Sequence, residues 1–260
     1  MIRVVVSGTG QMGALVRQTI EAQDDMEVVG VLEPLEPQGE GHLYPIGSDP
    51  ATLFSIVTPD VVVDFTNAEF TPGLVEACLE AGVRPVIGTS GVTPETIEQL
   101  RHGSAEASRG AVVASNFALG AVILMHLAEV ASPFFDNAEV IELHHDRKVD
   151  APSGTALDTA RRMRAARGRD FEHPDPTLTH IEGTRGGVAG GVGVHSVRLP
   201  GLVASQEVIF GGQGQTLTLR HDTTGRDSFM PGVLLAVREV MQRTVLVEGL
   251  DALIGLKDRQ

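Results

Sequence analysis

Cysteine and tryptophan are nearly absent from this sequence, which has one cysteine, Cys78, and no tryptophan. A single cysteine excludes any disulfide within the chain and predicts a reducing compartment, the cytoplasm. Cys78 lies in the apolar segment GLVEACLEAGV, so we expect a small buried side chain rather than a reactive thiol. The sequence has no apolar run long enough to span a bilayer and no signal-peptide pattern, so we expect a soluble protein.

Basic residues are also few, with 20 Lys and Arg against 34 Asp and Glu and a net charge of -14. This balance argues against binding to nucleic acid or to an anionic membrane surface, because both need a cationic surface. An acidic protein can bind an anionic small molecule only through a local basic cluster. Any such cluster is therefore informative.

Short β-branched runs alternate with helical patterns through the first half of the chain. We expect strands over residues 2–6, 27–32, 61–64, 85–87 and 111–114, and helices over residues 12–22, 72–81 and 94–107. This alternation predicts right-handed βαβ units and an α/β fold with a doubly wound parallel sheet.

The pattern changes after residue 116. We expect helices over residues 119–131 and 156–166, and strands over residues 138–143, 194–199, 204–210 and 215–221. Residues 182–193 hold six glycines and predict a mobile loop. A last helix over residues 231–241 is expected to return to the first domain. The predicted division is therefore 1–116 plus 227–260 for one domain, and 117–226 for an α+β domain built on a mixed or antiparallel sheet.

A glycine motif follows the first predicted strand directly and opens a helix: Gly8, Thr9, Gly10, Gln11, Met12 and Gly13. In this G-x-G-x-x-G pattern the glycines permit a tight turn, a close approach to a pyrophosphate and close helix–strand packing. Glu33 comes 20 residues after Gly13, where a carboxylate accepts from ribose hydroxyls. An ordinary glycine turn is the alternative, but the strand–turn–helix context favours a Rossmann-type dinucleotide site.

The residue after Glu33 bears on the choice of cofactor. The Glu33 carboxylate would repel a 2′-phosphate, and Pro34 replaces an arginine that could offset the repulsion. We therefore expect NADH to be favoured over NADPH. Further cofactor contacts are expected where other predicted strands end, although each segment alone could be a plain loop. These residues are Phe65, Thr66, Gly88, Thr89, Ser90, Ala114, Ser115, Asn116 and Phe117.

The densest polar segment, ELHHDRKVDAPSGTA, begins at residue 142. Its basic cluster, defined as His144, His145, Arg147 and Lys148, could bind an anionic ligand. Lysine and histidine can both bind a carboxylate and deliver a proton. The residues that follow form the expected N-terminus of a helix, which offers hydroxyls and free N–H groups to a carboxylate. They are Ser153, Gly154 and Thr155.

Several residues of this segment also have a structural interpretation instead of a functional one. The paired histidines could be half of a metal site, but no third ligand is evident, and we predict no metal. Asp146 and Arg147 are interpreted as solvated or structural, and Asp150 as a turn or cap residue. Ser153 lacks the G-x-S-x-G context of a nucleophile. For Arg220 and His221, structural pairing is favoured over a carboxylate contact.

The segment ELHHDRKVDAPSGTAL closely resembles the signature of the dihydrodipicolinate reductase family. The resemblance extends over nearly the whole chain, through GTGQMG, VVDFT, GTSG, ASNFALG and SFMPGVLLAVR. It implies an oxidoreductase that transfers a hydride from NADH or NADPH to 4-hydroxy-tetrahydrodipicolinate, a small dicarboxylate, in the diaminopimelate route to lysine. It also implies that residues 117–226 bind the substrate and assemble a homotetramer, beside a dinucleotide-binding domain.

The resemblance assigns roles to the residues of the polar segment. It implies that His144 is the general acid/base, that Lys148 is the proton donor and that His145 contacts the substrate. Ser153, Gly154 and Thr155 match the turn that holds a substrate carboxylate, and the glycine motif, Glu33 and the strand ends match the cofactor contacts.

One departure from the family pattern lies in the glycine loop. This loop is one residue shorter than in many members and has Gln11 in place of their basic residue, which agrees with a preference for NADH.

Two other functions stay open at this point. A different two-domain dehydrogenase, acting on a sugar or an amino acid, would not need the basic cluster. A catalytically idle dinucleotide sensor would need the glycines and Glu33 but not Lys148.

Overall fold

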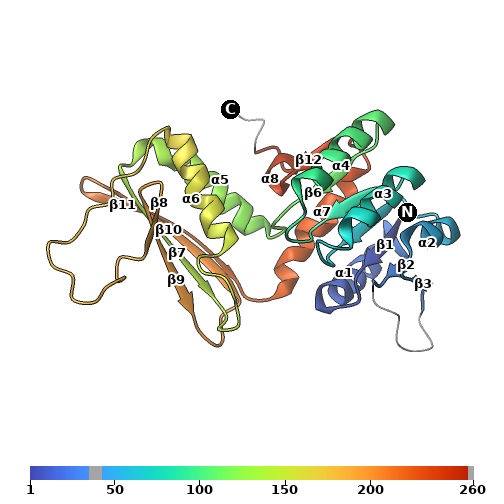
Figure 1. Ribbon diagram of the computed structural model, residues 1–260, viewed down its shortest axis with the longest axis horizontal. Helices are drawn as coiled ribbons and strands as arrows, with labels where there is room; N and C mark the ends of the chain where they lie inside the picture. The colour runs from blue at the N-terminus through green and yellow to red at the C-terminus, as the bar shows by residue number, and fades with distance from the viewer. Residues whose placement is uncertain (35–42, 257–260) are drawn as a thin grey trace. The chain divides into compact units, whose positions relative to one another are not determined.

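The computed structural model describes residues 1–34 and 43–256. The chain divides into two compact units. Figure 1 colours the chain from its N-terminus to its C-terminus. The first unit is Met1–Phe117 with Phe229–Gln260, and the second unit is Ala118–Ser228. The divisions expected from the sequence, after residues 116 and 226, lie close to these bounds. Within the described residues, no helix has both the length and the apolar character needed to cross a membrane.

The first unit contains a seven-stranded sheet in which every pair of neighbouring strands is parallel. The strand order is β12-β6-β5-β4-β1-β2-β3, so the parallel α/β sheet expected from the sequence is confirmed. The strands are β1 (Ile2–Ser7), β2 (Met26–Leu32), β3 (Ile46–Gly47), β4 (Val61–Asp64), β5 (Arg84–Ile87), β6 (Ala111–Val113) and β12 (Leu246–Glu248).

Helices of the first unit form two groups, since α2, α3 and α4 pack in a row while α1 packs against α7 (Figure 1). They are α1 (Gln11–Glu21), α2 (Pro50–Val57), α3 (Thr71–Ala81), α4 (Pro94–Ala107), α7 (Met230–Val240) and the short α8 (Leu250–Leu253). The sequence analysis missed α2. Its signal was present, because Pro50 occupies the first turn and the Asp49 side chain accepts from the N–H of Thr52 at 2.8 Å.

The second unit is built on a five-stranded mixed sheet with the order β11-β10-β7-β9-β8. Only β7 and β9 are parallel neighbours, so the mixed alternative was the correct one. Its elements are α5 (Leu119–Ala131), η1 (Ser132–Phe134), β7 (Asn137–His144), α6 (Gly154–Arg167), β8 (Gly187–Ala189), β9 (Val192–Arg198), β10 (Ala204–Gly212) and β11 (Gln215–Thr223). A 3-10 turn, η2 (Arg226–Phe229), leads back to the first unit.

The prediction of a mobile loop over residues 182–193 is wrong for the second half of this segment. There β8 pairs with the start of β9 in an antiparallel hairpin. Gly190 and Gly191 form its turn with φ angles of 60° and 82°, a region that side chains with a Cβ rarely adopt. A strand of three residues that itself contains a glycine carries too little periodicity to be seen in the sequence.

In the second unit, alternate residues of β7 face a core formed with α5 and α6. Ala138 and Val140 lie on this face, and the next residue with the same orientation is Glu142, whose exposed fraction is 0%. A fully buried carboxylate is costly unless its oxygens are hydrogen-bonded and its charge is paired. The neighbouring strand β9 supplies both through Arg198.

The Arg198 guanidinium binds the Glu142 carboxylate in a bidentate manner, with Nη2–Oε1 at 2.7 Å and Nη1–Oε2 at 2.9 Å. The backbone N–H of Ser153 donates to the same Oε1 at 3.2 Å. Burial alone would raise the pKa of Glu142. Hydrogen bonds from Arg198, Ser196 and His144 outweigh burial, so the pKa of this carboxyl lies below its ordinary value.

Replacing Arg198 tests how much this buried pair contributes to stability. Arg198→Met leaves Glu142 buried without its counter-charge, so we expect the free energy of unfolding at pH 8 to fall by about 3 kcal/mol. In wild type the lowered pKa of Glu142 stabilises the fold above the unfolded-state pKa. In the variant, burial raises the pKa of Glu142 in the folded state above its unfolded-state value. Protonation of Glu142 then recovers part of the lost free energy of unfolding. The difference between the two proteins, measured by urea unfolding, should therefore narrow as the pH is lowered from 8 to 5.

Arg220→Met is the matched control, because Arg220 pairs with Glu207 and Asp222 at an exposed position. Its loss should be about 1 kcal/mol or less. Equal losses for the two variants, or a difference that does not depend on pH, would contradict the buried-pair account.

Candidate active site

The glycine motif of the first unit forms a tight turn between β1 and α1. Gly8 has a φ of 107°, and a Cβ added at Gly13 would lie 1.8 Å from the Gly8 carbonyl oxygen, so both positions require glycine. A Cβ added at Gly10 would meet nothing within 4 Å. Gly10 is the N-cap of α1 and provides no side chain that could accept from the first N–H groups of the helix. The turn therefore has the open approach and the free helix N-terminus that a pyrophosphate needs.

Glu33 follows β2 and lies beside this turn. Its Oε2 accepts from the backbone N–H of Thr9 at 3.1 Å and also from the Thr9 hydroxyl. The side chain is thereby held at the glycine loop, where the sequence analysis expects a ribose contact. Gln11 begins α1 and is exposed, as is Thr9, whereas Met12 is partly buried.

A buried carboxylate, Asp64, joins the loops that follow β4 and β5. Its oxygens accept from the hydroxyls of Thr66 at 2.7 Å, Thr89 at 2.7 Å and Thr71 at 2.9 Å. The hydroxyls of Thr66 and Thr89 thus donate to Asp64, so neither hydroxyl proton is available to a cofactor. Sequence reasoning noted Asp64 only as the end of a strand. The signal was a lone carboxylate at the end of an otherwise apolar run, which demands a set of donors.

The remaining predicted cofactor residues lie along the same edge of the sheet. The rings of Phe65 and Phe117 make an edge-to-face contact with centroids 5.5 Å apart. A Cβ added at Gly88 would lie 2.2 Å from the ring of Phe65, so the loops after β4, β5 and β6 meet closely. Ser90 and Ser115 are exposed, Asn116 is partly exposed and Ala114 is buried.

This edge contains the point where the strand order changes direction. The chain runs from β1 to β2 on one side and then continues with β4 on the other side of β1. Open α/β sheets bind ligands at such a switch point, outside the carboxyl ends of the strands. The structure therefore brings all the predicted cofactor residues together in one candidate site within the first unit.

In the second unit, His144 is the last residue of β7 and its side chain is 15% exposed. Its Nδ1 contacts Oε2 of Glu142. A carboxylate can only accept here, so Nδ1 carries the proton in the neutral ring, and Nε2 is the atom that can exchange a proton with a ligand. Burial lowers the pKa of His144, the Glu142 carboxylate opposes this effect, and Lys148 and Arg198 lower it further, so the net direction is downward.

Lys148 is positioned by a turn and by an ion pair. Its backbone N–H donates to the His145 carbonyl at 3.2 Å, and its Nζ donates to Oδ1 of Asp150 at 2.7 Å. The ammonium of Lys148 holds the pKa of Asp150 below its usual range. Asp150 is therefore the partner of Lys148 as well as a turn residue, while Asp146 and Arg147 are exposed.

His145 carries an atom that is buried without a partner. Within the part of the chain that the structure describes, its Nδ1 has no hydrogen-bond partner. Buried polar atoms are nearly always hydrogen-bonded, so this atom is unusual, but a ligand cannot reach it in this conformation.

The turn before α6 presents backbone N–H groups beside this cluster. Ser153 is the N-cap of α6, and its Oγ accepts from the N–H of Ala156 at 3.2 Å. Because its own N–H donates to Glu142, only its hydroxyl proton can reach a ligand. A Cβ added at Gly154 would meet nothing within 4 Å, so the start of α6 is open on that side. The N–H groups of Gly154 and Thr155 lie in the first turn of this helix, where no helix carbonyl accepts from them. These two groups are the better carboxylate donors.

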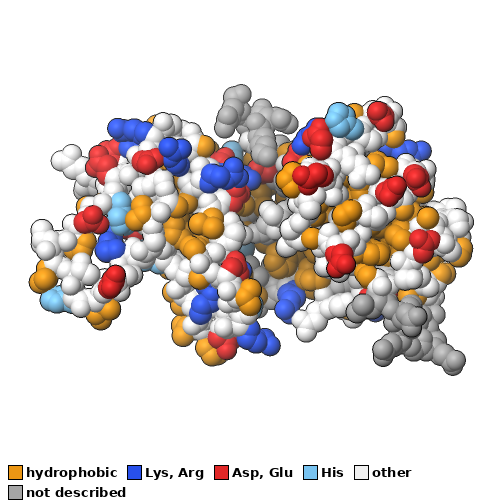
Figure 2. Space-filling model, in the orientation of Figure 1, with side chains coloured by type: hydrophobic (Ala, Val, Ile, Leu, Met, Phe, Trp, Pro, Cys, Tyr) orange, Lys and Arg blue, Asp and Glu red, His pale blue; other side chains and the backbone are white. Residues whose placement is uncertain are grey.

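Other cations of the second unit are neutralised by pairing. Figure 2 shows Lys and Arg side chains interspersed with Asp and Glu side chains over this face. On α6, Arg164 Nε lies 2.5 Å from Asp170 and Arg162 Nε lies 2.8 Å from Asp158. Arg220, with Asp222 and Glu207, is likewise structural. Among the described residues, no group of three or more His, Cys, Asp or Glu side chains is arranged to hold a metal ion.

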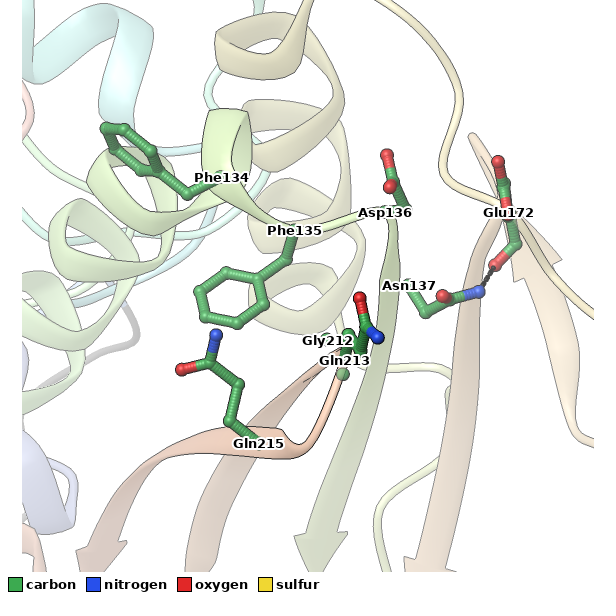
Figure 3. A pocket seen from close by; sticks show the side chains of 9 residues that line it. Phe134, Phe135, Asp136, Asn137, Glu172, Gly212, Gln213 and Gln215 are labelled. Carbon is green, nitrogen blue, oxygen red and sulfur yellow. Dashed lines mark hydrogen bonds between the residues drawn. The ribbon is translucent and has the colours of Figure 1, made fainter.

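A cavity of about 440 Å³ lies at the opposite end of β7 (Figure 3). Its lining includes Phe134, Phe135 and Asn137, and Asn137 Nδ2 donates to the carbonyl of Glu172 at 2.7 Å. Since β7 runs from Asn137 to His144, the cavity lies about 20 Å from the basic cluster at roughly 3.3 Å per residue. It is therefore separate from the candidate active site.

Two residues of this site escaped the sequence analysis, Glu142 as a buried anchor and Arg198 as its partner. The signal for Glu142 was its place in the alternation of β7, two residues after Val140 and four after Ala138. Arg198 ends β9, where its register opposite His144 depends on a parallel pairing that no local pattern reveals.

Comparisons with known proteins cover nearly the whole chain. The family models described as "Dihydrodipicolinate reductase, N-terminus" and "Dihydrodipicolinate reductase, C-terminus" match residues 2–117 and 120–254. A 4-hydroxy-tetrahydrodipicolinate reductase from Moorella thermoacetica is 47% identical, with 97% of this chain and 98% of the relative covered. One from Dehalococcoides mccartyi is 45% identical, with 98% and 99% covered.

A solved structure agrees with these sequences. It is described as dipicolinate-bound dihydrodipicolinate reductase from Paenisporosarcina sp. TG-14. Its fold is similar to that of this chain, with a TM-score of 0.90 and a sequence identity of 39%. The similarity covers 97% of this chain and 99% of that one. Together with the two family models, it shows that the chain belongs to the dihydrodipicolinate reductase family.

Proposed function

We propose that this protein reduces 4-hydroxy-tetrahydrodipicolinate to tetrahydrodipicolinate in the diaminopimelate route to lysine. The observation that carries the proposal is the placement of Lys148, His144 and the N-terminus of α6 around one end of β7, in a chain of this family. Relatives at 43–47% identity carry this activity as their name, and the similar solved structure holds dipicolinate, a flat ring with two carboxylates.

The substrate would be held by its two carboxylates at opposite ends. Lys148 supplies a cationic contact for one carboxylate, and the partly exposed His145 beside it supplies a polar contact. The N–H groups of Gly154 and Thr155, at the N-terminus of α6, supply donors for the other. Two fixed ends orient the ring, and such orientation can contribute several kcal/mol to the rate.

Reduced nicotinamide dinucleotide supplies the hydride when it is bound. Gly8, Gly10 and Gly13 fit its pyrophosphate, because the turn is open at Gly10 and because Gly13 of α1 packs closely against Gly8. Glu33 fits a ribose with free hydroxyls, and neither Gln11 nor Pro34 provides a positive charge for a 2′-phosphate. We therefore propose that NADH is preferred and that NADPH is the weaker cofactor.

Lys148 is the proposed proton donor, and His144 is the general acid/base, which can donate from Nε2 only as the imidazolium. Negative charge grows on the substrate as it is reduced, so the Lys148 ammonium next to it stabilises the transition state more than the ground state. Asp150 holds the Nζ of Lys148 in place, and Glu142 holds the His144 ring with Nε2 available. The lowered pKa of His144 favours the neutral ring near pH 7, so Lys148 is the better proton donor there.

Assembly into a homotetramer through the second unit is part of the proposal. It is supported by apolar side chains that the sheet and its connections expose, among them Val188 at 58% and Leu199 at 54%. The edge strand β11 is also exposed along most of its length. A lone buried cysteine and the use of reduced nicotinamide fit a cytoplasmic location.

Lys148→Ala tests the proposed proton donor. We expect kcat to fall about 100-fold or more, because the variant loses a positioned acid and a cation next to the growing charge. The measurement is the decrease of NADH absorbance with the condensation product of pyruvate and aspartate semialdehyde as substrate. Arg169→Ala is the control, since this exposed cation of the same unit pairs with Asp136 at the other end of β7, and its kcat should stay near wild type. A Lys148→Ala enzyme with wild-type kcat would remove Lys148 from the mechanism.

The choice of cofactor is tested by comparing kcat/KM for NADH and NADPH. Repulsion between Glu33 and a 2′-phosphate should favour NADH about tenfold, which corresponds to about 1.4 kcal/mol. Glu33→Ser should reduce the ratio because it removes the repelling charge. A wild-type enzyme that prefers NADPH would refute the proposed role of Glu33.

A further inference from the structure

We propose that Glu142 is a positioning residue that fixes the orientation and the proton position of His144 and ties that ring to the carboxylate-binding turn before α6. This inference rests on the proposed function for its kinetic consequences. Its structural part concerns contacts within the second unit alone. Glu142 has an exposed fraction of 0% and therefore does not meet the substrate from solvent.

The Glu142 carboxylate is itself fixed by four partners, one of which is the side chain of Ser196. Arg198 binds both of its oxygens, the N–H of Ser153 donates to Oε1, and His144 Nδ1 contacts Oε2. Arg198 and the Ser153 N–H can only donate, so they hold the carboxylate in one orientation whatever the state of His144. The fixed carboxylate then determines which ring nitrogen of His144 carries the proton.

The orientation of His144 decides which nitrogen faces a ligand. With Nδ1–H donating to Oε2, the neutral ring carries its lone pair on Nε2. A ring turned the other way would place Nε2 against the carboxylate and expose a different atom. The charged groups that act on His144 are Glu142 on its own strand, Lys148 after that strand and Arg198 on β9. Glu142 is the one among these that favours the imidazolium.

The same carboxylate connects His144 with the turn that presents Gly154 and Thr155. Glu142 Oε1 accepts from Ser153 at 3.2 Å, and Ser153 in turn caps α6 through its Oγ. A shift of Glu142 would therefore move the imidazole and the first turn of α6 together. The Glu142 side chain therefore fixes the position of the His144 imidazole relative to the N–H groups at the start of α6.

A purely structural role for Glu142 is the alternative, and Glu142→Gln separates the two. The amide oxygen can replace Oε1, which accepts from the Ser153 N–H and from Nη2 of Arg198. The amide NH2 then replaces Oε2, where it loses the bond from Nη1 of Arg198 and donates to Nδ1 of His144. The neutral ring should then carry its proton on Nε2 instead of Nδ1. The loss of the carboxylate also removes the group that raises the pKa of His144, so this pKa should fall further.

The first measurement is kinetic and uses the full-length protein. We expect Glu142→Gln to lower kcat about 100-fold and to move the limb of the pH profile that belongs to His144 toward lower pH. Glu142→Asp keeps the charge, so its kcat should be roughly tenfold or more above that of Glu142→Gln, with a pH profile close to wild type. A loss that follows only the folded fraction, with an unshifted profile, would overturn the proposal.

The second measurement does not depend on activity. Proton–nitrogen correlation spectra of protein labelled with 15N-histidine, assigned with His144→Gln, report which ring nitrogen carries the proton. The proposal requires Nδ1–H in wild type and Nε2–H in Glu142→Gln, and the same tautomer in both proteins would overturn it. If wild-type protein does not reduce the substrate, the proposed function fails, while these spectra still decide whether Glu142 sets the state of His144.

Discussion

The bidentate pair between Glu142 and Arg198 is the constraint on which the second unit depends. It places a charge in a core otherwise formed by apolar side chains, and it does so at the end of β7 where the candidate catalytic residues begin. A hydrophobic pair of the same volume could stabilise such a core as well or better. The position of the carboxylate, in contact with His144 and with the N-terminus of α6, gives the pair a functional reason.

A comparable arrangement lies in the first unit. Asp64 is fully buried, and the hydroxyls of Thr66 and Thr89, from two loops, and of Thr71, the first residue of α3, donate to it. It fixes the loops at the sheet edge where the glycine turn and Glu33 also lie. In both units a buried carboxylate organises the backbone around a candidate ligand site, and the residues that would touch the ligand are its neighbours.

Local signals allowed the sequence to predict most of the fold. Periodicity located β4, α4 and α5, and the glycine motif with Glu33 located the cofactor edge, because these features depend on neighbouring residues. The helix α2 and the hairpin of β8 with β9 were missed because both are short, and the hairpin is also rich in glycine. The role of Arg198 could not be predicted, since it depends on the pairing of β7 with β9. The apolar run before Asp64 signalled a buried carboxylate, but not its donor Thr89 from the loop after β5.

The central claim is that the second unit grips a flat ring by two carboxylates, and calorimetric titration of wild-type protein tests it most directly. The two ligands to compare are pyridine-2,6-dicarboxylate and pyridine-2-carboxylate, which differ by one carboxylate. A charge-assisted contact contributes about 2 kcal/mol, so the account predicts roughly 30-fold tighter binding of the dicarboxylate. Equal dissociation constants for the two ligands would contradict it.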